Sequence, residues 1–345
     1  MFAHIDMDYF YAQAEEIRDP TCLGKVVVVC VYSGRTEDSG VVSSVNYLGR
    51  SFGIKAAMPI INAKKLAPND AIFLPMDRDY YELLSSSVDR IIRSNFYKTI
   101  QASIDEWNVE DDLALRKAHS VKDLIKSELG LTCTVGVAPS LLGAKMIAAV
   151  SKPNGLQALD EKEEQHFIST SKVIDIPGIG DKTADALSKM NIKIVSDLVK
   201  ADPISIIEVF GKKTAYWLLD LGRNKYPNEL GEEKEQVAIS RIGTLKEKTR
   251  DLGQLSKKIS ELEVEAKQWL MHSKKAYRTI SVIFISDDMK THTKSESFKN
   301  PKTWESEIVV KHLIEEFLAE NPLDVRRIGI RFGNFVDLGG QTTLF

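Results

Sequence analysis

The chain begins with a short apolar strand that ends in two carboxylates, and no other stretch constrains the fold as strongly. Phe2 to Met7 is predicted to form this strand, and three aromatic residues follow where a helix should begin. Side chains alternate along a strand, so Asp6 and Asp8 are expected on one face. Acidic side chains are poor material for a protein core. This strand end is therefore either exposed, with an aspartate capping the helix, or part of a cation site that needs further carboxylates.

A second acidic pair, much later in the chain, supplies those carboxylates. Asp105 and Glu106 are adjacent, and neighbours in a regular strand point to opposite faces. Both can therefore reach one site only at a turn or a bulge. Oxygen ligands with no nearby histidine or cysteine suit Mg²⁺ rather than zinc. Three carboxylates from two strands, holding two ions, are what phosphoryl or nucleotidyl transfer requires.

Composition indicates a globular protein with more than one domain. A length of 345 residues favours two or more domains, and 43% hydrophobic with 28% charged residues is ordinary for such proteins. Cys22, Cys30 and Cys133 are far apart, which argues against a disulfide framework or a zinc site and favours a reducing cytoplasm. The N-terminus has no basic start and no long apolar run, so neither secretion nor membrane spanning is expected.

The overall charge gives little support to a nucleic-acid partner. The formal net charge is -3, whereas DNA-binding proteins are often basic. Segregated charge would remove this objection, with acids at a catalytic site and lysines along a groove. Composition alone therefore predicts only an unspecified cytoplasmic enzyme.

Residues 166–229 are predicted to be all-helical and contain a helix-hairpin-helix signature. The signature is Val173–Leu187, in which Gly178 and Gly180 allow a tight turn ahead of Lys182. Backbone N–H groups at such a turn face a phosphate at the start of a helix. These hairpins hold the DNA backbone without reading sequence. A plain glycine turn between two helices is the alternative.

The C-terminal part is predicted to follow a linker at Tyr226–Gln236, which is polar and contains Pro and Gly. Residues 240–336 then follow the order β-α-β-β-α-β of a ferredoxin-like domain. The predicted strands are Ser240–Leu245, Arg278–Ser286, Thr291–Phe298 and Arg326–Phe332, and the predicted helices are Asp251–His272 and Trp304–Glu320. Its sheet is expected to present basic side chains to DNA, unless they form a solvated charged face. These include Arg241, Arg326, Arg327 and Arg331.

Several stretches, in order along nearly the whole chain, resemble the Y-family DNA polymerases, in particular the archaeal DinB (DNA polymerase IV) type. The matching stretches are Ile5–Glu16, Val28–Arg35, Asn46–Arg50, Ser103–Glu106, Thr134–Val137 and Ser151–Gly155. The resemblance implies an α+β multidomain fold, a right-hand polymerase with palm, fingers, helical thumb and ferredoxin-like little finger. It divides the chain into a palm (1–10 and 77–165), fingers (11–76), a thumb (166–229), a linker (230–239), a little finger (240–336) and a tail (337–345).

The family's activity is template-directed, error-tolerant translesion synthesis. The resemblance implies that deoxynucleoside triphosphates are added to the primer 3′ end of a primer-template DNA by two-metal transfer, with two Mg²⁺ ions per active site. Nothing in the sequence resembles an added exonuclease domain, so proofreading is not expected. A monomer is expected.

The resemblance also implies roles for individual residues. Asp6, Asp105 and the carbonyl of Met7 are expected to hold the ion that binds the triphosphate. Asp6, Asp105 and Glu106 are expected to hold the ion that activates the primer hydroxyl. Tyr11 is expected to lie against the deoxyribose as a steric gate against ribonucleotides. The other residues expected at the nucleotide are Tyr9, Phe10, Ser44, Tyr47, Arg50 and Lys152.

The last residues resemble a peptide that docks on a sliding clamp. Two flexible glycines precede Gln341, and Leu344 and Phe345 follow in the spacing Gln-x-x-Leu-Phe. A frayed chain end is the alternative.

Two departures from the family pattern keep other functions open. Trp107–Glu110 stands where the family has Ala-Tyr-Leu-Asp, and Ser140–Gly143 replaces its Asn-Lys. A catalytically weakened paralogue that binds primer-template DNA as a scaffold is therefore one alternative. A two-metal nuclease is another, although Tyr47, Arg50 and Lys152 argue against it because a nuclease needs no triphosphate contacts.

Overall fold

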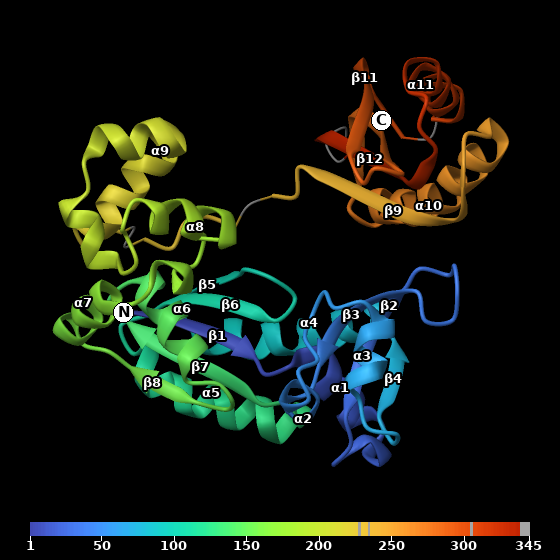
Figure 1. Cartoon of the computed structure of the whole chain (residues 1–345). Coiled ribbons are helices and arrows are strands. Elements are labelled where there is room, and N and C mark those ends of the chain that lie inside the picture. Colours follow the sequence, from blue (N-terminus) through green and yellow to red (C-terminus); the bar gives the residue numbers. More distant parts are fainter. Residues whose placement is uncertain (227–228, 234, 304–305, 339–345) are drawn as a thin grey trace, which may run out of the picture. The chain divides into compact units, whose positions relative to one another are not determined.

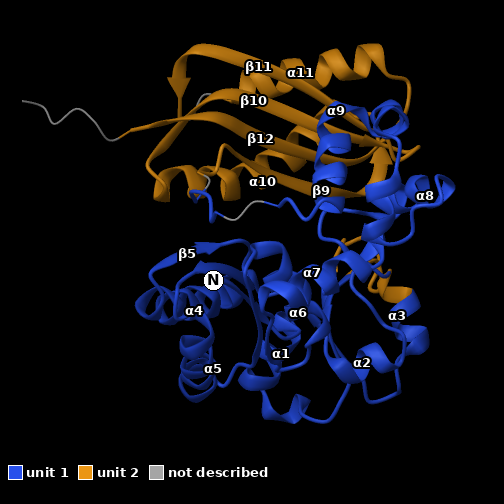
Figure 2. Cartoon of the chain, turned by 90° about the vertical axis from the view of Figure 1, so that its left-hand side faces the viewer, with its two compact units in different colours: residues 1–30, 42–58, 62–233 blue, residues 31–41, 59–61, 234–345 orange. Residues whose placement is uncertain are grey.

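Figure 1 shows the computed structural model of the chain, which describes residues 1–226, 229–233, 235–303 and 306–338. Two compact units are coloured separately in Figure 2. Unit 1 comprises residues 1–30, 42–58 and 62–233, and unit 2 comprises residues 31–41, 59–61 and 234–345. The predicted clamp-docking residues Gln341, Leu344 and Phe345 lie outside the described residues. Within the described ranges, no helix is long and apolar enough to cross a membrane.

A five-stranded sheet forms the centre of unit 1 (Figure 1). In spatial order its strands are β5 (Lys98–Gln101), β6 (Glu106–Glu110), β1 (Phe2–Met7), β7 (Cys133–Ala138) and β8 (Leu156–Ala158). β1 pairs antiparallel with both β6 and β7, whereas β7 and β8 run parallel. The predicted bounds of the first strand are confirmed, and this strand is the central one.

One face of this sheet carries an apolar core. Ala3, Ile5 and Met7 of β1 pack there with helices α4 (Arg78–Asn95) and α5 (Ala114–Leu129). Because side chains alternate, the remaining residues of β1 point to the opposite face. The core therefore fixes the register of β1 and, with it, the face on which Asp6 lies.

The opposite face is covered only in part, by helix α6 (Leu141–Val150). The apolar run from Leu141 to Val150 predicts a helix with these bounds, and this prediction is confirmed. The small residues of α6 allow a close approach to β7, since a Cβ atom on Gly136 would collide with the backbone of Ala144 and Ala148. Phe2 packs with Ala144 at this end of β1. The other end of β1, where Asp6 lies, is left open to a cavity.

A three-stranded sheet follows β1 in the sequence. Its order is β3 (Gly40–Val45), β2 (Val27–Tyr32) and β4 (Ile72–Pro75), and β2 runs parallel to β4. The β-branched run from Val26 to Val31 predicts a buried strand. This is confirmed for Val26 to Cys30, which are buried, whereas Val31 is exposed. The helices of this part are α1 (Phe10–Arg18), η1 (Pro20–Cys22), α2 (Tyr47–Ser51) and α3 (Ile60–Leu66).

The last part of unit 1 is helical, as predicted. Its elements are α7 (Glu161–Thr170), η2 (Val173–Asp175), α8 (Asp181–Lys189), η3 (Val195–Lys200) and α9 (Pro203–Gly222). They share one apolar core. Gly211 interrupts α9 with a φ of 73°, a left-handed conformation that a glycine adopts without steric cost.

The predicted linker is partly anchored. Described residues 229–233 and 235–237 form neither helix nor strand. Leu230, however, is buried beside Phe2, and its N–H donates to a carboxylate oxygen of Glu110 at 3.3 Å. A single apolar residue has no periodicity, so no pattern in the sequence predicts this contact.

Unit 2 contains a four-stranded antiparallel sheet with the predicted element order. The elements are β9 (Ala238–Thr249), α10 (Leu252–His272), β10 (Lys275–Ser286), β11 (Thr291–Lys302), α11 (Glu307–Glu320) and β12 (Val325–Asp337), and the sheet order is β11-β10-β12-β9. Both helices pack with the sheet in one core. Trp304, the predicted start of the second helix, lies outside the described residues. The α+β multidomain fold class is confirmed.

Candidate active site

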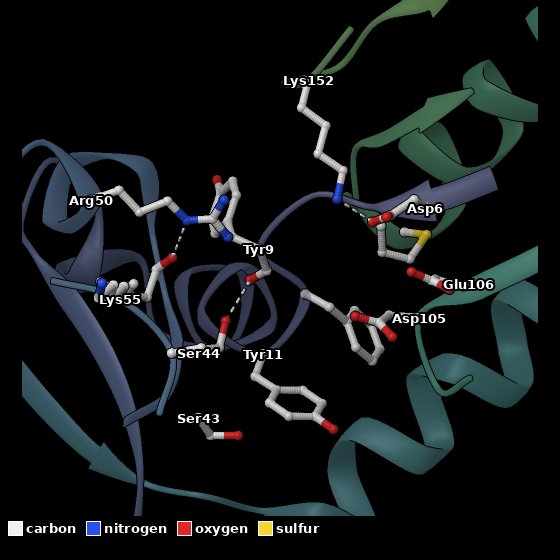
Figure 3. A pocket seen from close by; sticks show the side chains of 14 residues that line it. Asp6, Tyr9, Tyr11, Ser43, Ser44, Arg50, Lys55, Asp105, Glu106 and Lys152 are labelled. Carbon is white, nitrogen blue, oxygen red and sulfur yellow. Dashed lines mark hydrogen bonds and ion pairs between the residues drawn. The ribbon is translucent and has the colours of Figure 1, made fainter. Parts of the chain in front are cut away.

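A cavity of about 530 Å³ opens where β1 ends (Figure 3). Its walls come from β1, the start of α1, β3, α2 and the turn between β5 and β6. Ser44, Arg50 and Lys55 lie on one side of Figure 3, and Asp6, Asp105 and Glu106 lie on the other. The cavity therefore has a basic and hydroxyl-bearing wall opposite an acidic one.

The three predicted carboxylates meet in this cavity because of strand register and one turn. Asp6 of β1 lies directly opposite Glu106, the first residue of β6. Asp105 precedes that strand in the turn, where its carbonyl accepts a hydrogen bond from the N–H of Met7 at 2.9 Å. The Ser103 hydroxyl donates to the Asp105 carboxylate at 2.6 Å. The expectation that adjacent acids reach one site only at a turn is confirmed.

Two lysines partly neutralise the acidic wall. Lys152 Nζ lies 2.6 Å from Asp6 Oδ1, and Lys145 Nζ lies 2.7 Å from Glu106 Oε2. Burial raises the pKa of Asp6 to about 6; Lys152 opposes this shift, and the negative charges of Glu106 and Asp105 add to it. Burial also acts to raise the pKa of Glu106, but the hydrogen bond from Lys145 holds this pKa below its ordinary value.

The donor atoms of this wall fit a hard divalent cation. Carboxylate oxygens from Asp6, Asp105 and Glu106, with the Met7 carbonyl nearby, are the ligands that Mg²⁺ prefers. The raised pKa of Asp6 is caused first by burial and then by the nearby negative charges of Glu106 and Asp105, and a bound cation would oppose both effects.

The sequence reasoning missed a histidine beside the carboxylates. His4 lies on β1 two positions before Asp6, so strand alternation places both on the same face. Its side chain is 1% exposed, and Nδ1 lies 2.7 Å from Asn108 Oδ1. Burial lowers the pKa of His4 to about 4. The spacing of two positions between His4 and Asp6 along the strand is the signal in the sequence that points to this residue.

Asp8 corrects the alternative of an exposed, capping aspartate. Its side chain is fully buried, and helix α1 has Tyr9 as its N-cap residue, with no side-chain cap. The Asp8 carboxylate accepts hydrogen bonds from Thr134 Oγ1 at 2.8 Å, the Tyr47 hydroxyl at 3.3 Å and the Asn154 N–H at 2.9 Å. The chain has left the strand at Met7, so alternation no longer holds, and hydrogen bonds offset the burial of the charge.

Asp8 helps to hold the loop that carries Lys152. The ammonium group of Lys122, on α5, donates to the carbonyl oxygens of Cys133, Asn154 and Gly155 and to the side-chain oxygen of Asn154. Together with the contact between Asp8 and Asn154, this fixes the backbone next to Lys152. The position of Lys152 at Asp6 therefore depends on two charged residues outside the cavity.

The aromatic residues after β1 line the floor of the cavity. Tyr9, Phe10 and Tyr11 all contribute to it. The ring of Tyr11 stacks on Tyr81 with centroids 4.4 Å apart and an interplanar angle of 15°. Burial raises the pKa of Tyr11, so its hydroxyl stays protonated at neutral pH. Tyr11 is thus a fixed, uncharged ring beside the carboxylates (Figure 3).

The predicted nucleotide-binding residues are brought together, with one exception. Arg50 and Ser44 line the cavity, and Ser44 Oγ donates to the Tyr9 carbonyl at 3.3 Å. The cavity wall of the described residues does not include Tyr47, whose ring lies 4.9 Å from the Arg50 guanidinium. Lys55, which the sequence reasoning did not select, also lines the cavity.

The predicted DNA-binding residues lie on elements that do not line the cavity. Gly178 and Gly180 are exposed in the turn before α8, and Lys182 is exposed in the first turn of that helix. Arg326, Arg327 and Arg331 lie on β12, and Arg331 is exposed. Arg241 of β9 forms an ion pair with Glu265 of α10 at 3.2 Å, on the helix-covered side of the sheet. The DNA-binding roles of all these residues remain predictions.

Two segments of the chain match one protein family. Residues 5–149 match the impB/mucB/samB family, and residues 236–344 match the C-terminal domain of that family. DNA polymerase IV of Methanosarcina acetivorans is 36% identical over 358 aligned positions, which cover 99% of this chain and 98% of the relative. DNA polymerase IV of Saccharolobus solfataricus is 34% identical over 351 positions, with coverages of 99% and 98%.

Solved structures give the same result. A Y-family DNA polymerase chimera of Dbh and Dpo4 is similar with a TM-score of 0.90 and 34% identity, covering 97% of this chain and 99% of that chain. An insertion ternary complex of Dbh DNA polymerase has a TM-score of 0.72 and 34% identity, with the same coverages. The chain therefore belongs to the impB/mucB/samB family, the Y family of DNA polymerases.

Proposed function

We propose that the chain is a template-directed, error-tolerant translesion DNA polymerase that adds deoxynucleotides to a primer 3′ end. The observation that carries this proposal is the cavity with three carboxylates facing Arg50 and Lys55. A nucleoside triphosphate needs cations for its phosphates, and a primer hydroxyl needs help to lose its proton. The DNA polymerase IV relatives of full length support the same activity.

The acidic wall would hold two Mg²⁺ ions. Asp6, Asp105 and the Met7 carbonyl would bind one ion, and Asp6, Asp105 and Glu106 would bind the other. The chemistry that such an ion pair supplies is activation of the primer hydroxyl and neutralisation of charge on the transferring phosphate. The proximity of all three carboxylates to one cavity supports this ligand set.

The opposite wall would orient the triphosphate. Arg50 offers its guanidinium for paired hydrogen bonds to phosphate oxygens, and Ser44 offers a hydroxyl. Lys152 contacts Asp6 at 2.6 Å in this structure, and its flexible ammonium is free to turn to a phosphate once a cation takes the carboxylate. Tyr47 would act through Arg50, since its ring lies beneath that guanidinium. Tyr11 would contact the deoxyribose from the floor.

Two boundaries of the hand-like division fall between elements, after β4 and after α9, whereas α1, α7 and β9 each cross one of the other boundaries. Residues 1–10 and 77–165 would form the palm, 11–76 the fingers and 166–229 the thumb. Residues 240–336 would form the little finger after a linker at 230–239. Primer-template DNA would contact the exposed turn at Gly178 and Gly180 and the basic side chains of β12. The enzyme would work as a monomer without proofreading, and its tail would bind a sliding clamp.

The scaffold alternative receives no support from the two departures. Trp107 is fully buried in the apolar core, on the other side of β6 from Glu106, and its indole N–H donates to Asp89 at 3.0 Å. Ser140 caps α6, and its hydroxyl donates to the buried Glu164 at 2.7 Å. Both departures are satisfied locally and leave the carboxylates in place, which favours an active enzyme.

Primer extension tests the proposed function. With Mg²⁺ and all four deoxynucleotides, we expect extension of a labelled primer on an undamaged template and insertion opposite an abasic site. A 3′-mismatched primer without nucleotides should keep its length, because no proofreading is expected. Binding of primer-template without extension would contradict the polymerase and support the scaffold. Shortening of the primer would support a nuclease.

A further inference from the structure

His4 brings a nitrogen donor to the carboxylate cluster. One ring nitrogen of His4 and one carboxylate oxygen from each of Asp6 and Glu106 lie within 4.8 Å of one another. The three residues come from paired strands and share one face of the sheet, since Asp6 lies opposite Glu106 and His4 opposite Asn108. Their arrangement is therefore set by strand register rather than by a mobile loop.

The hydrogen bond of His4 determines which nitrogen is available. Nδ1 lies 2.7 Å from Asn108 Oδ1, and an amide oxygen only accepts, so Nδ1 carries the proton. The lone pair of the neutral ring is then on Nε2. A histidine that binds a metal commonly has this arrangement, in which the second nitrogen donates to an oxygen and fixes the orientation of the ring.

The Nε2 atom is buried and has no hydrogen-bond partner among the described residues. The residue as a whole is 1% exposed. Leaving a buried acceptor without a hydrogen-bond partner is destabilising. The neighbouring lysines bind the carboxylates instead, Lys145 on Glu106 and Lys152 on Asp6. An unpaired lone pair on a ring with one nitrogen within 4.8 Å of two carboxylate oxygens is suited to a cation.

We propose that His4, Asp6 and Glu106 form a site for a divalent transition cation of the zinc class. Imidazole nitrogen favours zinc and its neighbours over Mg²⁺, which prefers oxygen. Three protein ligands with one open position are a common zinc arrangement, and donors about 2.1 Å from the ion lie about 3.4 Å apart. The present separation of up to 4.8 Å needs only a small side-chain movement to reach this geometry. A cation there uses two of the three carboxylates and so competes with the proposed Mg²⁺ pair.

Nuclear magnetic resonance of the natural chain with ¹⁵N-labelled histidine tests this site without any substitution. We expect Zn²⁺ to shift the ring ¹⁵N resonance of His4, identified by its absence in His4→Phe, whereas Mg²⁺ should leave it nearly unchanged. The exposed His119 and His166 report adventitious zinc. A response of these histidines while His4 stays unchanged would overturn the proposal.

Calorimetry on variants gives a second, independent result. His4→Phe should weaken Zn²⁺ binding at least about tenfold and change Mg²⁺ binding less than about twofold, because only zinc uses the nitrogen. His119→Gln is the matched control and should bind both ions normally. Equal zinc affinity in His4→Phe and the parent would overturn the site. If His4→Phe binds neither Zn²⁺ nor Mg²⁺, the response of the His4 ¹⁵N resonance to Zn²⁺ in the natural chain decides whether the site exists. Neither measurement needs nucleotide addition, so failure of the proposed polymerase activity would be seen separately.

Discussion

Two lysine residues partly offset the negative charge of the carboxylates in the cavity. Lys145 and Lys152 each contact one carboxylate, and burial still raises the pKa of Asp6 to about 6. The acidic wall is therefore under electrostatic strain that a cation or a triphosphate with its cations would relieve. The same burial keeps His4 neutral at physiological pH.

The buried His4 predicts a loss of stability in mild acid. Its pKa falls from the ordinary 6.5 to about 4, so the unfolded chain binds a proton below pH 6.5 that the folded chain refuses until about pH 4. The stabilising effect of the neutral ring is complete above pH 6.5 and is lost as the pH falls toward 4, by on the order of 3 kcal/mol. The raised pKa of Asp6 acts in the opposite direction.

The comparison with His4→Phe isolates this effect, because Asp6 titrates in both proteins. Urea unfolding in EDTA at pH 7 and pH 4.5 should show a larger loss of unfolding free energy in the parent than in the variant. The same pH dependence in both would show that His4 is not the group that titrates.

The position of the Tyr11 ring predicts that this residue selects deoxyribonucleotides over ribonucleotides. Its ring is held against Tyr81 at 4.4 Å, so it cannot move aside readily for a 2′-hydroxyl. Tyr11→Ala should raise ribonucleotide incorporation by at least about tenfold, or roughly 1.4 kcal/mol of transition-state discrimination. The measurement is kcat/KM for both sugars opposite the same template base. Tyr81→Phe, which keeps the stacked ring, is the control, and unchanged selectivity in Tyr11→Ala would place the sugar choice elsewhere.

For single residues, the acidic side chains of the site could be predicted from the sequence, whereas the other residues around them could not. Asp6, Asp105 and Glu106 were predictable because acids at the ends of apolar strands have few other uses. His4 and Lys55 were not, because each is a single residue whose importance depends on what the fold brings near it. The burial of Asp8 depends on Thr134, Tyr47 and Asn154, and no local pattern in the sequence links these residues.

Among the elements, the turn before α8 is the one best suited to hold DNA. Gly178 has a φ of 98°, which favours glycine, whereas Gly180 has an ordinary backbone conformation and nothing within 4 Å of an added Cβ. Gly180→Val should therefore fold normally. It should weaken primer-template binding about equally for every sequence tested, because the new side chain blocks close approach of a phosphate to the backbone.

Binding titrations with several template sequences check this expectation. Gly231→Val is the matched control, since Gly231 also has open space around it and lies outside the hairpin. Sequence-selective weakening, or equal binding by Gly180→Val and its parent, would mean that the turn does not contact a phosphate.

Whether a segment forms a helix or a strand could be predicted from the sequence, whereas the residues at which it begins and ends were harder to predict. β1 and α6 have the predicted bounds because each is a largely apolar run that ends at polar residues. Strand β9 runs from Ala238 to Thr249, longer than the predicted Ser240–Leu245. Its extra residues are held by pairing with β12, for instance Thr249 with Val325, and this pairing leaves no local signal in the sequence.

For the whole molecule, the net charge of -3 makes the distribution of charge decisive for DNA binding. Arg327 and Arg331 alternate on β12 with Ile328 and Ile330, which belong to the core, so both arginines face away from it. Lys294 of β11 instead forms ion pairs with Glu316 and Glu320 of α11. The two arginines are therefore the better candidates for phosphate contacts.

Salt dependence measures how many phosphates these arginines neutralise. Each contact contributes about 0.9 to the slope of log affinity against log salt concentration. The double variant Arg327→Gln, Arg331→Gln should reduce this slope by about 2, and Lys294→Gln should leave it unchanged. A double variant with the slope of the parent would exclude this face from DNA binding.

The most direct test of the proposed enzyme is single-turnover nucleotide addition by Asp105→Ala, with primer-template affinity measured on the same sample. Asp105 lines the cavity with the other carboxylates and would bind both ions, so its loss should remove several kcal/mol of transition-state stabilisation. Asp112→Ala, at an exposed acid of the same unit, is the control. We predict at least about a thousandfold slower addition for Asp105→Ala with DNA affinity unchanged. Addition at the rate of the parent would contradict the assignment of the metal ligands and, with it, the proposed mechanism.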